Sequence, residues 1–296
     1  MTSVTHRITQ YNKDVGQPRG GLINPKLFTV EQLGGDGYGV LDGKQENSHA
    51  SVVGAAVDYL SRLALVRSTE TGAMSEAADV FRASLRGAQR ISDFTDHVAV
   101  ASDAASALGE LPIEDLEDGT VAFRIDETAV LVACQLATYD VGLRAGVHLY
   151  NPESTLRSPD ETTTAHILAM VQRAKRFFET YGPVTADGFV FVDGDELLAG
   201  GRGGYTDLVN SGDGDFLTAD TLWDFKVSAS KPTKDHTLQL LMYFLMGKAS
   251  GMPEFATQTQ VGIFNPRLNT VHRLAVAEVP AEVIEIIRRD VIGYAR

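Results

Sequence analysis

Apolar residues recur every three or four positions through residues 49–182, a spacing that places them on one face of a helix. In the first such segment, Val53, Val57 and Leu60 form the apolar stripe. The pattern predicts helices over residues 51–67, 74–91, 126–145 and 161–181. We expect the cations near the end of the last helix, Arg173, Lys175 and Arg176, to face solvent.

The pattern changes near residue 184 to short apolar or alternating runs bounded by glycine-rich stretches, which is typical of strands. Strands are predicted over residues 188–192, 205–209, 215–218, 221–227, 260–264 and 271–276. A helix over residues 235–247 interrupts them, with Asp235 able to cap its start and Gly247 its end. A final helix is predicted over residues 280–292.

This change of period divides the chain into three regions. Residues 1–48 are rich in glycine and polar residues and predict an extended arm with edge segments. Residues 49–182 predict a mainly helical layer, and residues 183–296 predict a core in which helices flank a mixed sheet. No convincing linker separates the regions, so we expect one compact domain of the α/β class.

The composition is that of an ordinary globular protein, with 44% hydrophobic and 22% charged residues. The chain contains no run of about 18 apolar residues, and its polar start lacks the apolar segment of a secretory signal. The one cysteine, Cys134, excludes an internal disulfide, and its apolar neighbours predict burial. These features predict a cytoplasmic protein with no membrane partner.

The formal net charge of −13 argues against a protein that coats nucleic acid, because binding to phosphates relies on clustered lysine and arginine. Residues 226–248 differ, since they contain four lysines and one acid, Asp235. An enzyme can gather positive charge at one cleft while the rest of its surface stays acidic. The acidity therefore weakens the expectation of nucleic-acid binding without excluding it.

Residues that can carry chemistry gather in the strand region. Asp215 and Asp224 lie in two runs predicted to be neighbouring strands, and two carboxylates can hold a hard divalent cation. Lys226 follows Asp224 by two residues and therefore points to the same face of its strand. Gln239 and Tyr243 follow at positions i and i+4 of one helix. A cation that polarises a phosphoryl oxygen, together with a nearby ammonium, can hydrolyse a phosphodiester.

In this order and spacing the residues resemble the PD-(D/E)XK nuclease superfamily, and within it the RecB-like branch, which adds a Gln-x-x-x-Tyr helix. The close match covers residues 205–248. The resemblance implies a restriction-endonuclease-like core in which Asp215 is the first acid, Asp224 and Lys226 form the Asp-x-Lys pair, and Gln239 and Tyr243 form the helix signature. It implies a metal-dependent nuclease that acts on nucleic acid, with DNA as the expected substrate.

The resemblance also implies a bound Mg²⁺ or Mn²⁺, held by Asp215 and Asp224 with Asp58 and the carbonyl of Phe225 as further ligands. The RecB-like branch carries a glycine followed four residues later by histidine or glutamate. Gly54 and Asp58 are the nearest match here, with an aspartate at the second position. Asp58 as a surface acid of a helix is an equal alternative.

Simpler interpretations stay open for the remaining polar residues. An Asp-x-Lys at the end of an apolar run is common as a solvated strand end, and Gln239 with Tyr243 could form a polar stripe over the sheet edge. We expect His236 to lie at a helix start, Arg267 on a turn between strands, and Asp213 in a turn.

Two rival functions use the same residues. A nuclease fold that acts as a non-catalytic binding or regulatory subunit would suit the acidic surface, whereas the intact set of Asp215, Asp224 and Lys226 favours catalysis. A metal-dependent hydrolase of another phosphate ester is the second rival. The sequence leaves open DNA or RNA, single or double strands, endonuclease or exonuclease action, oligomeric state, protein partners and pathway.

Overall fold

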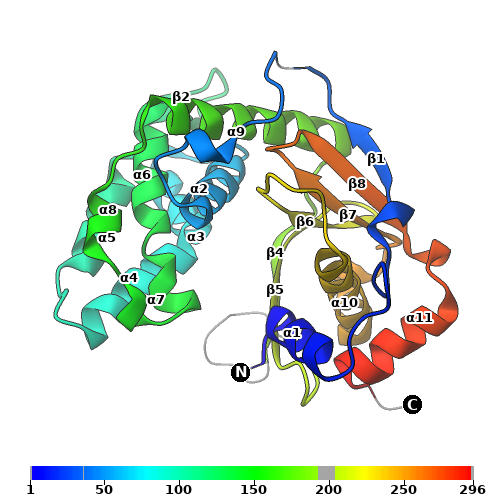
Figure 1. Ribbon diagram of the computed structural model, residues 1–296. Coiled ribbons are helices and arrows are strands. Elements are labelled where there is room, and N and C mark those ends of the chain that lie inside the picture. The colour runs from blue at the N-terminus through cyan, green and yellow to red at the C-terminus, as the bar shows by residue number, and fades with distance from the viewer. Residues whose placement is uncertain (1, 36, 193–203, 295–296) are drawn as a thin grey trace.

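The computed structural model describes residues 2–35, 37–192 and 204–294, which form two lobes joined by one long helix (Figure 1). The helical lobe consists of α2 (Ala50–Leu63), α3 (Glu70–Val80), α4 (Arg82–Phe94), α5 (Val100–Gly109), α6 (Glu127–Ala137), α7 (Asp140–Arg144), α8 (Pro152–Leu156) and the hairpin of β2 (Ile113–Asp115) and β3 (Val121–Phe123). Helix α9 (Glu161–Tyr181) runs along this lobe and on to a six-stranded sheet.

The sheet has the strand order β1–β8–β7–β6–β5–β4. Its strands are β1 (Thr29–Gln32), β4 (Ala186–Val192), β5 (Ser211–Leu217), β6 (Thr221–Phe225), β7 (Gln260–Asn265) and β8 (Thr270–Ala275). Neighbouring strands are antiparallel except β6 and β7, which run parallel and are connected through α10 (Lys234–Ser250). A parallel pair requires such a crossover because both strands start at the same sheet edge. The expected α/β class, with a mixed sheet flanked by helices, is confirmed.

Helices cover both faces of this sheet. On one face, α10 packs with α1 (Val4–Asp14) and with α11 (Ala281–Ile286), which continues as a π-helical segment, Ile287–Ile292 (Figure 1). On the other face, the ring of Phe177 from α9 lies 4.8 Å from that of Trp223 and 4.3 Å from that of Phe264, centroid to centroid. Full burial of a phenylalanine side chain contributes about 1.5 to 3 kcal/mol, so these contacts fix α9 on the sheet.

Most of the predicted elements are present, although several boundaries differ. Helix α9 has the predicted bounds, because the Asp160 side chain accepts a hydrogen bond from the Thr163 N–H and Pro183 cannot continue the helix. The helix predicted over 74–91 is divided at Phe81 into α3 and α4, and the one predicted over 126–145 into α6 and α7. Residues 205–209 form no strand, and α1, α5, α8 and the β2–β3 hairpin were not predicted.

The ends of α10 were also predicted wrongly. Thr233, not Asp235, is the N-cap: its hydroxyl accepts from the His236 N–H, while the His236 ring accepts from the Thr233 N–H. The helix continues past Gly247 to Ser250 and ends at Gly251, whose φ of 71° is the left-handed conformation that favours glycine. His236 therefore lies at a helix start, as expected.

Arg173 is completely buried where α9 meets the sheet. Its guanidinium donates hydrogen bonds to the carbonyls of Pro266 and Arg267 and to those of Tyr38 and Gly39. The prediction that Arg173 faces solvent is wrong, because these backbone oxygens replace water around the cation. The side chain connects the β7–β8 turn to the glycine-rich segment that precedes α2.

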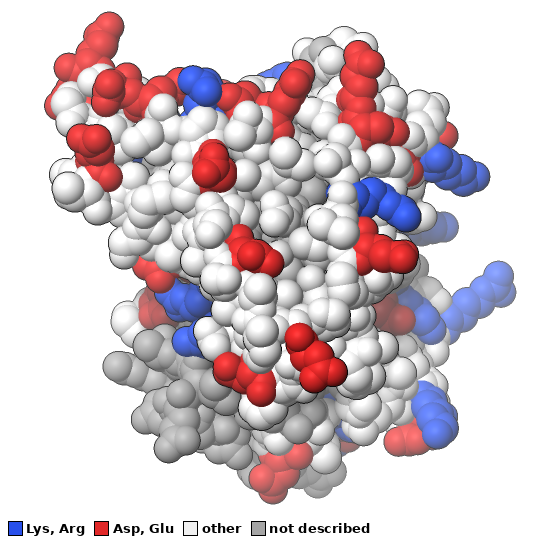
Figure 2. Space-filling model, turned by 90° about the vertical axis from the view of Figure 1, so that its left-hand side faces the viewer, with Lys and Arg blue, Asp and Glu red and all other residues white. Residues whose placement is uncertain are grey.

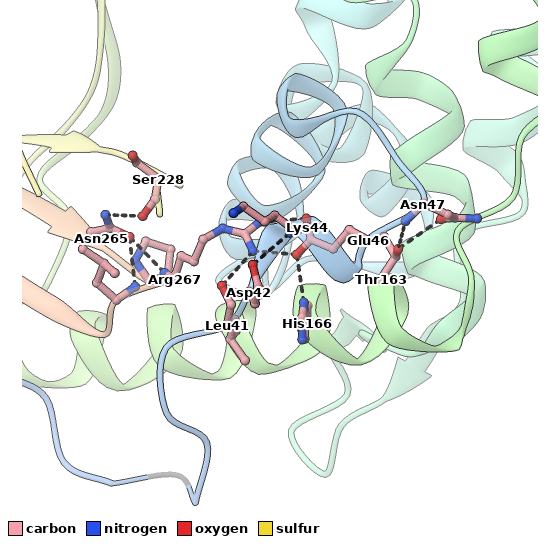
Figure 3. A network of polar contacts seen from close by, with 12 residues as sticks. Leu41, Asp42, Lys44, Glu46, Asn47, Thr163, His166, Ser228, Asn265 and Arg267 are labelled. Atoms are coloured by element: carbon pink, nitrogen blue, oxygen red, sulfur yellow. Dashed lines mark hydrogen bonds and ion pairs between the residues drawn. The ribbon is translucent and has the colours of Figure 1, made fainter. Parts of the chain in front are cut away.

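Arg267 lies on the β7–β8 turn, as expected, but its side chain belongs to a buried ionic network (Figure 3). The guanidinium contacts both oxygens of Glu46, at 2.6 and 3.0 Å, and donates to the Leu41 carbonyl at 3.2 Å. Glu46 also lies 2.9 Å from Nδ1 of His166 on α9. This network holds the segment before α2, helix α9 and the β7–β8 turn together.

We expect Arg267→Ala to lower the free energy of unfolding by about 3 to 5 kcal/mol, because it leaves the buried Glu46 carboxylate without its main cation. Arg289→Ala is the matched control, since Arg289 pairs with Asp290 on the exposed surface and should change stability far less. Denaturant unfolding of the wild type and the two variants measures both changes in the free energy of unfolding. Equal losses in the two variants would contradict the role of this network.

Candidate functional site

Asp215 and Asp224 lie side by side because of the register of β5 and β6. Phe216 pairs with Trp223 in the antiparallel ladder, so the next position in the same register places Asp215 opposite Asp224. Opposite residues in such a pair have Cβ atoms about 4.5 to 5.5 Å apart, on one face. The ladder ends at this point, where the Asp215 carboxylate accepts a hydrogen bond from the Phe225 N–H.

The Asp224 carboxylate is buried and only half satisfied. The residue is 4% exposed. One oxygen, Oδ1, lies 2.9 Å from Nζ of Lys226, whereas Oδ2 has no hydrogen-bond partner among the described residues. A buried anionic oxygen without a partner is costly, and such atoms are rare in folded proteins. Oδ2 of Asp224 is therefore a ligand position available to a cation.

Asp215 is a poor place for a second negative charge. Burial, followed by the charges of Asp224 and Asp58, raises the pKa of Asp215 from 3.8 to about 7. Its side chain keeps 27% exposure, so solvent screens part of this repulsion. Burial is the largest cause of the raised pKa, and the two neighbouring carboxylates add to it in the same direction. A cation bound between Asp215 and Asp224 would offset the repulsion between these two carboxylates.

Arg62 of α2 joins three of the acids around this site. Its guanidinium lies 3.1 Å from Asp58, 2.9 Å from Asp187 and 3.9 Å from Asp215. Asp58 is thus near the site, as the sequence indicated, but its carboxylate is engaged in an i,i+4 ion pair with Arg62. Within the described part of the chain, no three Asp, Glu, His or Cys side chains are grouped as a metal-binding cluster.

The formal charges of this cluster do not balance. Among the described residues it contains four carboxylates, Asp58, Asp187, Asp215 and Asp224, and two cations, Arg62 and Lys226, so the formal charge of these six is −2 when every acid is ionised. A nearby fifth acid, Asp213, lies 3.3 Å from Arg144, which also contacts Asp140 at 3.5 Å. One divalent cation would neutralise the formal charge of −2 on the four acids and two cations. Asp213 lies within β5, so the expectation that it forms a turn is wrong.

Lys226 keeps its proton in this environment. Burial alone would lower its pKa, but the charges of Asp224 and Asp215 outweigh burial, and the pKa of Lys226 is raised. Nearby, burial and then the charge of Lys226 lower the pKa of His236. At neutral pH the site therefore presents one ammonium and one neutral imidazole.

Gln239 and Tyr243 lie beside the acids but inside the protein. The Gln239 amide donates to the Tyr243 hydroxyl at 3.1 Å, and the two residues are 9% and 3% exposed. The Tyr243 ring packs edge-on against Phe189 at 5.6 Å between centroids. Burial, followed by the charge of Asp213, raises the pKa of the Tyr243 phenol. In this structure the pair supports β5 from within the core.

A pocket of about 380 Å³ adjoins the site between α2 and the sheet, and its lining includes Asp58, Arg62, Asp187 and Phe225. A larger pocket of about 640 Å³ lies in the helical lobe, with His97, Tyr139 and Tyr150 in its wall, and shares no lining residue with the first. The smaller pocket is therefore the one relevant to the candidate site.

Arg62 and Asp187 were not identified from the sequence. The i,i+4 spacing of Asp58 and Arg62 is a readable signal for an ion pair on a helix. Nothing in the sequence around Asp187 shows that β4 brings it to the same guanidinium, because that contact joins residues 125 positions apart. The carbonyl of Phe225, a predicted ligand, directly follows Asp224 in the chain, and the Phe225 N–H is held by Asp215.

No protein-family model, curated protein or solved structure matches the chain. Among the described helices, none has the length and apolar character needed to cross a membrane.

Without divalent cations, the stability of the wild-type protein should fall more steeply between about pH 4 and 7 than that of Asp215→Asn. The folded pKa of Asp215 lies above its usual 3.8, so in this range the folded state binds more protons than the unfolded state and loses stability as pH rises. Denaturant titrations in a chelating buffer at several pH values measure this difference. Parallel pH profiles for the two proteins would show that the pKa of Asp215 is not raised in the folded state.

Proposed function

We propose that this protein is a nuclease that depends on Mg²⁺ or Mn²⁺, with a restriction-endonuclease-like core of the PD-(D/E)XK type. The observation that supports it best is the proximity of Asp215 to Asp224, whose buried Oδ2 has no partner among the described residues. Lys226, in ion contact with Asp224, adds the ammonium that phosphodiester hydrolysis uses.

The residues at the site suit a hard cation. Asp215 and Asp224 would hold it, with the Phe225 carbonyl next in the chain, and all of these donors are oxygen atoms. The one cysteine, Cys134, is buried in the helical core and supplies no ligand for zinc. Asp58 would join the ligands only after its ion pair with Arg62 is broken.

Bound at these acids, the cation would polarise the scissile phosphate and lower the pKa of a coordinated water. The raised pKa of Lys226 makes it a poor proton acceptor, so we assign it to orienting water and to stabilising negative charge that develops on the phosphate. We assign Gln239 and Tyr243 as positioning residues, because their burial keeps them from contacting a strand of nucleic acid. Their hydrogen bond orients the Tyr243 ring, which packs against Gly212 of β5.

The distribution of charge restricts where nucleic acid can approach. Residues 50–160 contain eight arginines, no lysine and 17 acids, a formal charge of −9. Figure 2 shows the outer face of the helical lobe, where acidic side chains are spread widely and Lys and Arg lie mainly near the edges. Lys231 and Lys234 lie in and after the β6–α10 connection, close to Lys226 in the chain. We therefore propose that the phosphate backbone approaches along this connection.

The non-catalytic alternative is supported by two observations. Arg62 already lies 3.9 Å from Asp215, where it competes with a metal cation, and the formal net charge of the chain is −13. A binding or regulatory subunit would need neither Lys226 nor a bound cation for its activity. A cleavage assay separates the two functions.

With Mg²⁺ or Mn²⁺, the wild-type protein should cleave single-stranded DNA, duplex DNA or RNA, and Lys226→Ala should lower kcat by about 100-fold or more. Substrate binding should remain nearly intact, because the ammonium acts mainly on charge that develops in the transition state. Single-turnover cleavage measures the rate, and fluorescence anisotropy measures binding.

Lys248→Ala is the matched control, since Lys248 lies at the far end of α10 and donates to the Ala256 carbonyl. It should cleave at the wild-type rate. Failure of the wild type to cleave any of these substrates would favour the non-catalytic subunit, and full activity in Lys226→Ala would contradict the role proposed for Lys226.

A further inference from the structure

The pocket between α2 and the sheet, here called the α2 pocket, has aromatic walls and a polar interior. Its volume of about 380 Å³ lies within the range of about 300 to 1,000 Å³ found for small-ligand sites. Phe178 of α9, Phe216 of β5 and Phe225 of β6 contribute to the lining. The rings of Phe178 and Phe216 meet edge to face, with centroids 5.3 Å apart. Such walls suit a flat aromatic ligand.

Ser61 gives this pocket an unused hydrogen-bonding group. The residue lines the pocket and is 2% exposed, and its hydroxyl has no partner among the described residues. A buried serine on a helix commonly donates to the carbonyl four residues earlier, but this hydroxyl does not. Because an unsatisfied hydroxyl costs stability, its retention in a pocket is best explained by a ligand with a polar edge.

The α2 pocket is adjacent to the candidate active site. Asp58, Arg62 and Asp187 line the pocket, and the same guanidinium reaches Asp215. Phe225 contributes to the pocket wall and donates its N–H to Asp215. A group bound in the pocket would therefore lie beside the acids. The exposed Arg67 supplies positive charge at the pocket for phosphates attached to that group, whereas Arg62 is already paired with Asp58 and Asp187.

We propose that the α2 pocket binds one unpaired nucleobase of the nucleic-acid substrate, next to the phosphate that is cleaved. The inference rests on the proposed nuclease function and narrows its substrate to strands with an accessible base. A nucleobase combines a flat ring, which packs against phenylalanine, with a polar edge, which pairs with the Ser61 hydroxyl. A base within a duplex is stacked and paired, so it cannot enter without being extruded.

The test uses a 12-nucleotide single-stranded DNA with 2-aminopurine at one position, whose fluorescence reports base unstacking. Binding is measured in Ca²⁺, and the length of the DNA is verified by electrophoresis. The wild-type protein should change the 2-aminopurine signal and bind the single strand more tightly than its duplex. Ser61→Ala should weaken binding roughly three- to tenfold, the effect of one hydrogen bond, and Leu65→Trp, at a pocket residue that is 43% exposed, should abolish the signal change.

Ser102→Ala is the control, because Ser102 is an exposed helical serine whose hydroxyl donates to the Ala99 carbonyl. It should bind like the wild type. Thermal unfolding verifies that each variant is folded. Because Ser61→Ala removes an unsatisfied hydroxyl, it should be as stable as the wild type or more stable. A loss of binding in a stable Ser61→Ala protein therefore reports a ligand contact.

Wild-type affinity in both Ser61→Ala and Leu65→Trp, or equal affinity for single strand and duplex, would overturn the proposal. The assay also separates the two proposals. If the protein binds the base through Ser61 but cleaves nothing with Mg²⁺ or Mn²⁺, base binding in the α2 pocket is supported and the nuclease function is contradicted. If Leu65→Trp cleaves single strands with the KM of the wild type, the nuclease function is supported and base binding in the α2 pocket is contradicted.

Discussion

The repulsion between the carboxylates of Asp215 and Asp224 is the constraint on which the site depends. The register of β5 and β6 places them together, and among the described residues Lys226 and Arg62 are the cations that contact them. Lys226 satisfies one oxygen of Asp224 and leaves the other without a partner among the described residues, while Arg62 is shared among three acids. Asp224 is the buried acid of this cluster, and its unpaired oxygen costs stability unless a ligand contacts it. The formal deficit matches one divalent cation.

The site is assembled from both lobes, so its geometry depends on how they are joined. Arg62 and Asp58 come from α2 in the helical lobe, whereas Asp187, Asp215 and Asp224 come from the sheet. The buried Glu46–Arg267 pair and the Arg173 contacts fix the segment that leads into α2 against the β7–β8 turn. These interactions lie away from the acids, yet they set the position of α2 beside β5. The α2 pocket exists for the same reason, since α2 forms one wall and the sheet another.

The sequence predicted the local features well and the long-range ones poorly. The period-2 pattern located β5 and β6, which carry Asp215 and Asp224, although β6 ends at Phe225 and Lys226 directly follows it. The burial of Gln239 and Tyr243 was not foreseen, because an apolar helix does not show which side of it is covered. The Arg62–Asp187 contact and the buried Arg173 depend on tertiary packing between distant segments, which residue spacing does not encode. Composition likewise gave no sign that helix α1 packs against α10.

The most direct test of the central claim is a calorimetric titration of the metal-free protein with Mn²⁺. We predict one bound ion per chain in the wild type and in Asp118→Asn, a control at an exposed acid in the helical lobe. Asp224→Asn should weaken Mn²⁺ binding by at least about tenfold, since it removes the buried carboxylate with the unpartnered oxygen. Absence of binding in the wild type, or unchanged affinity in Asp224→Asn, would contradict the account.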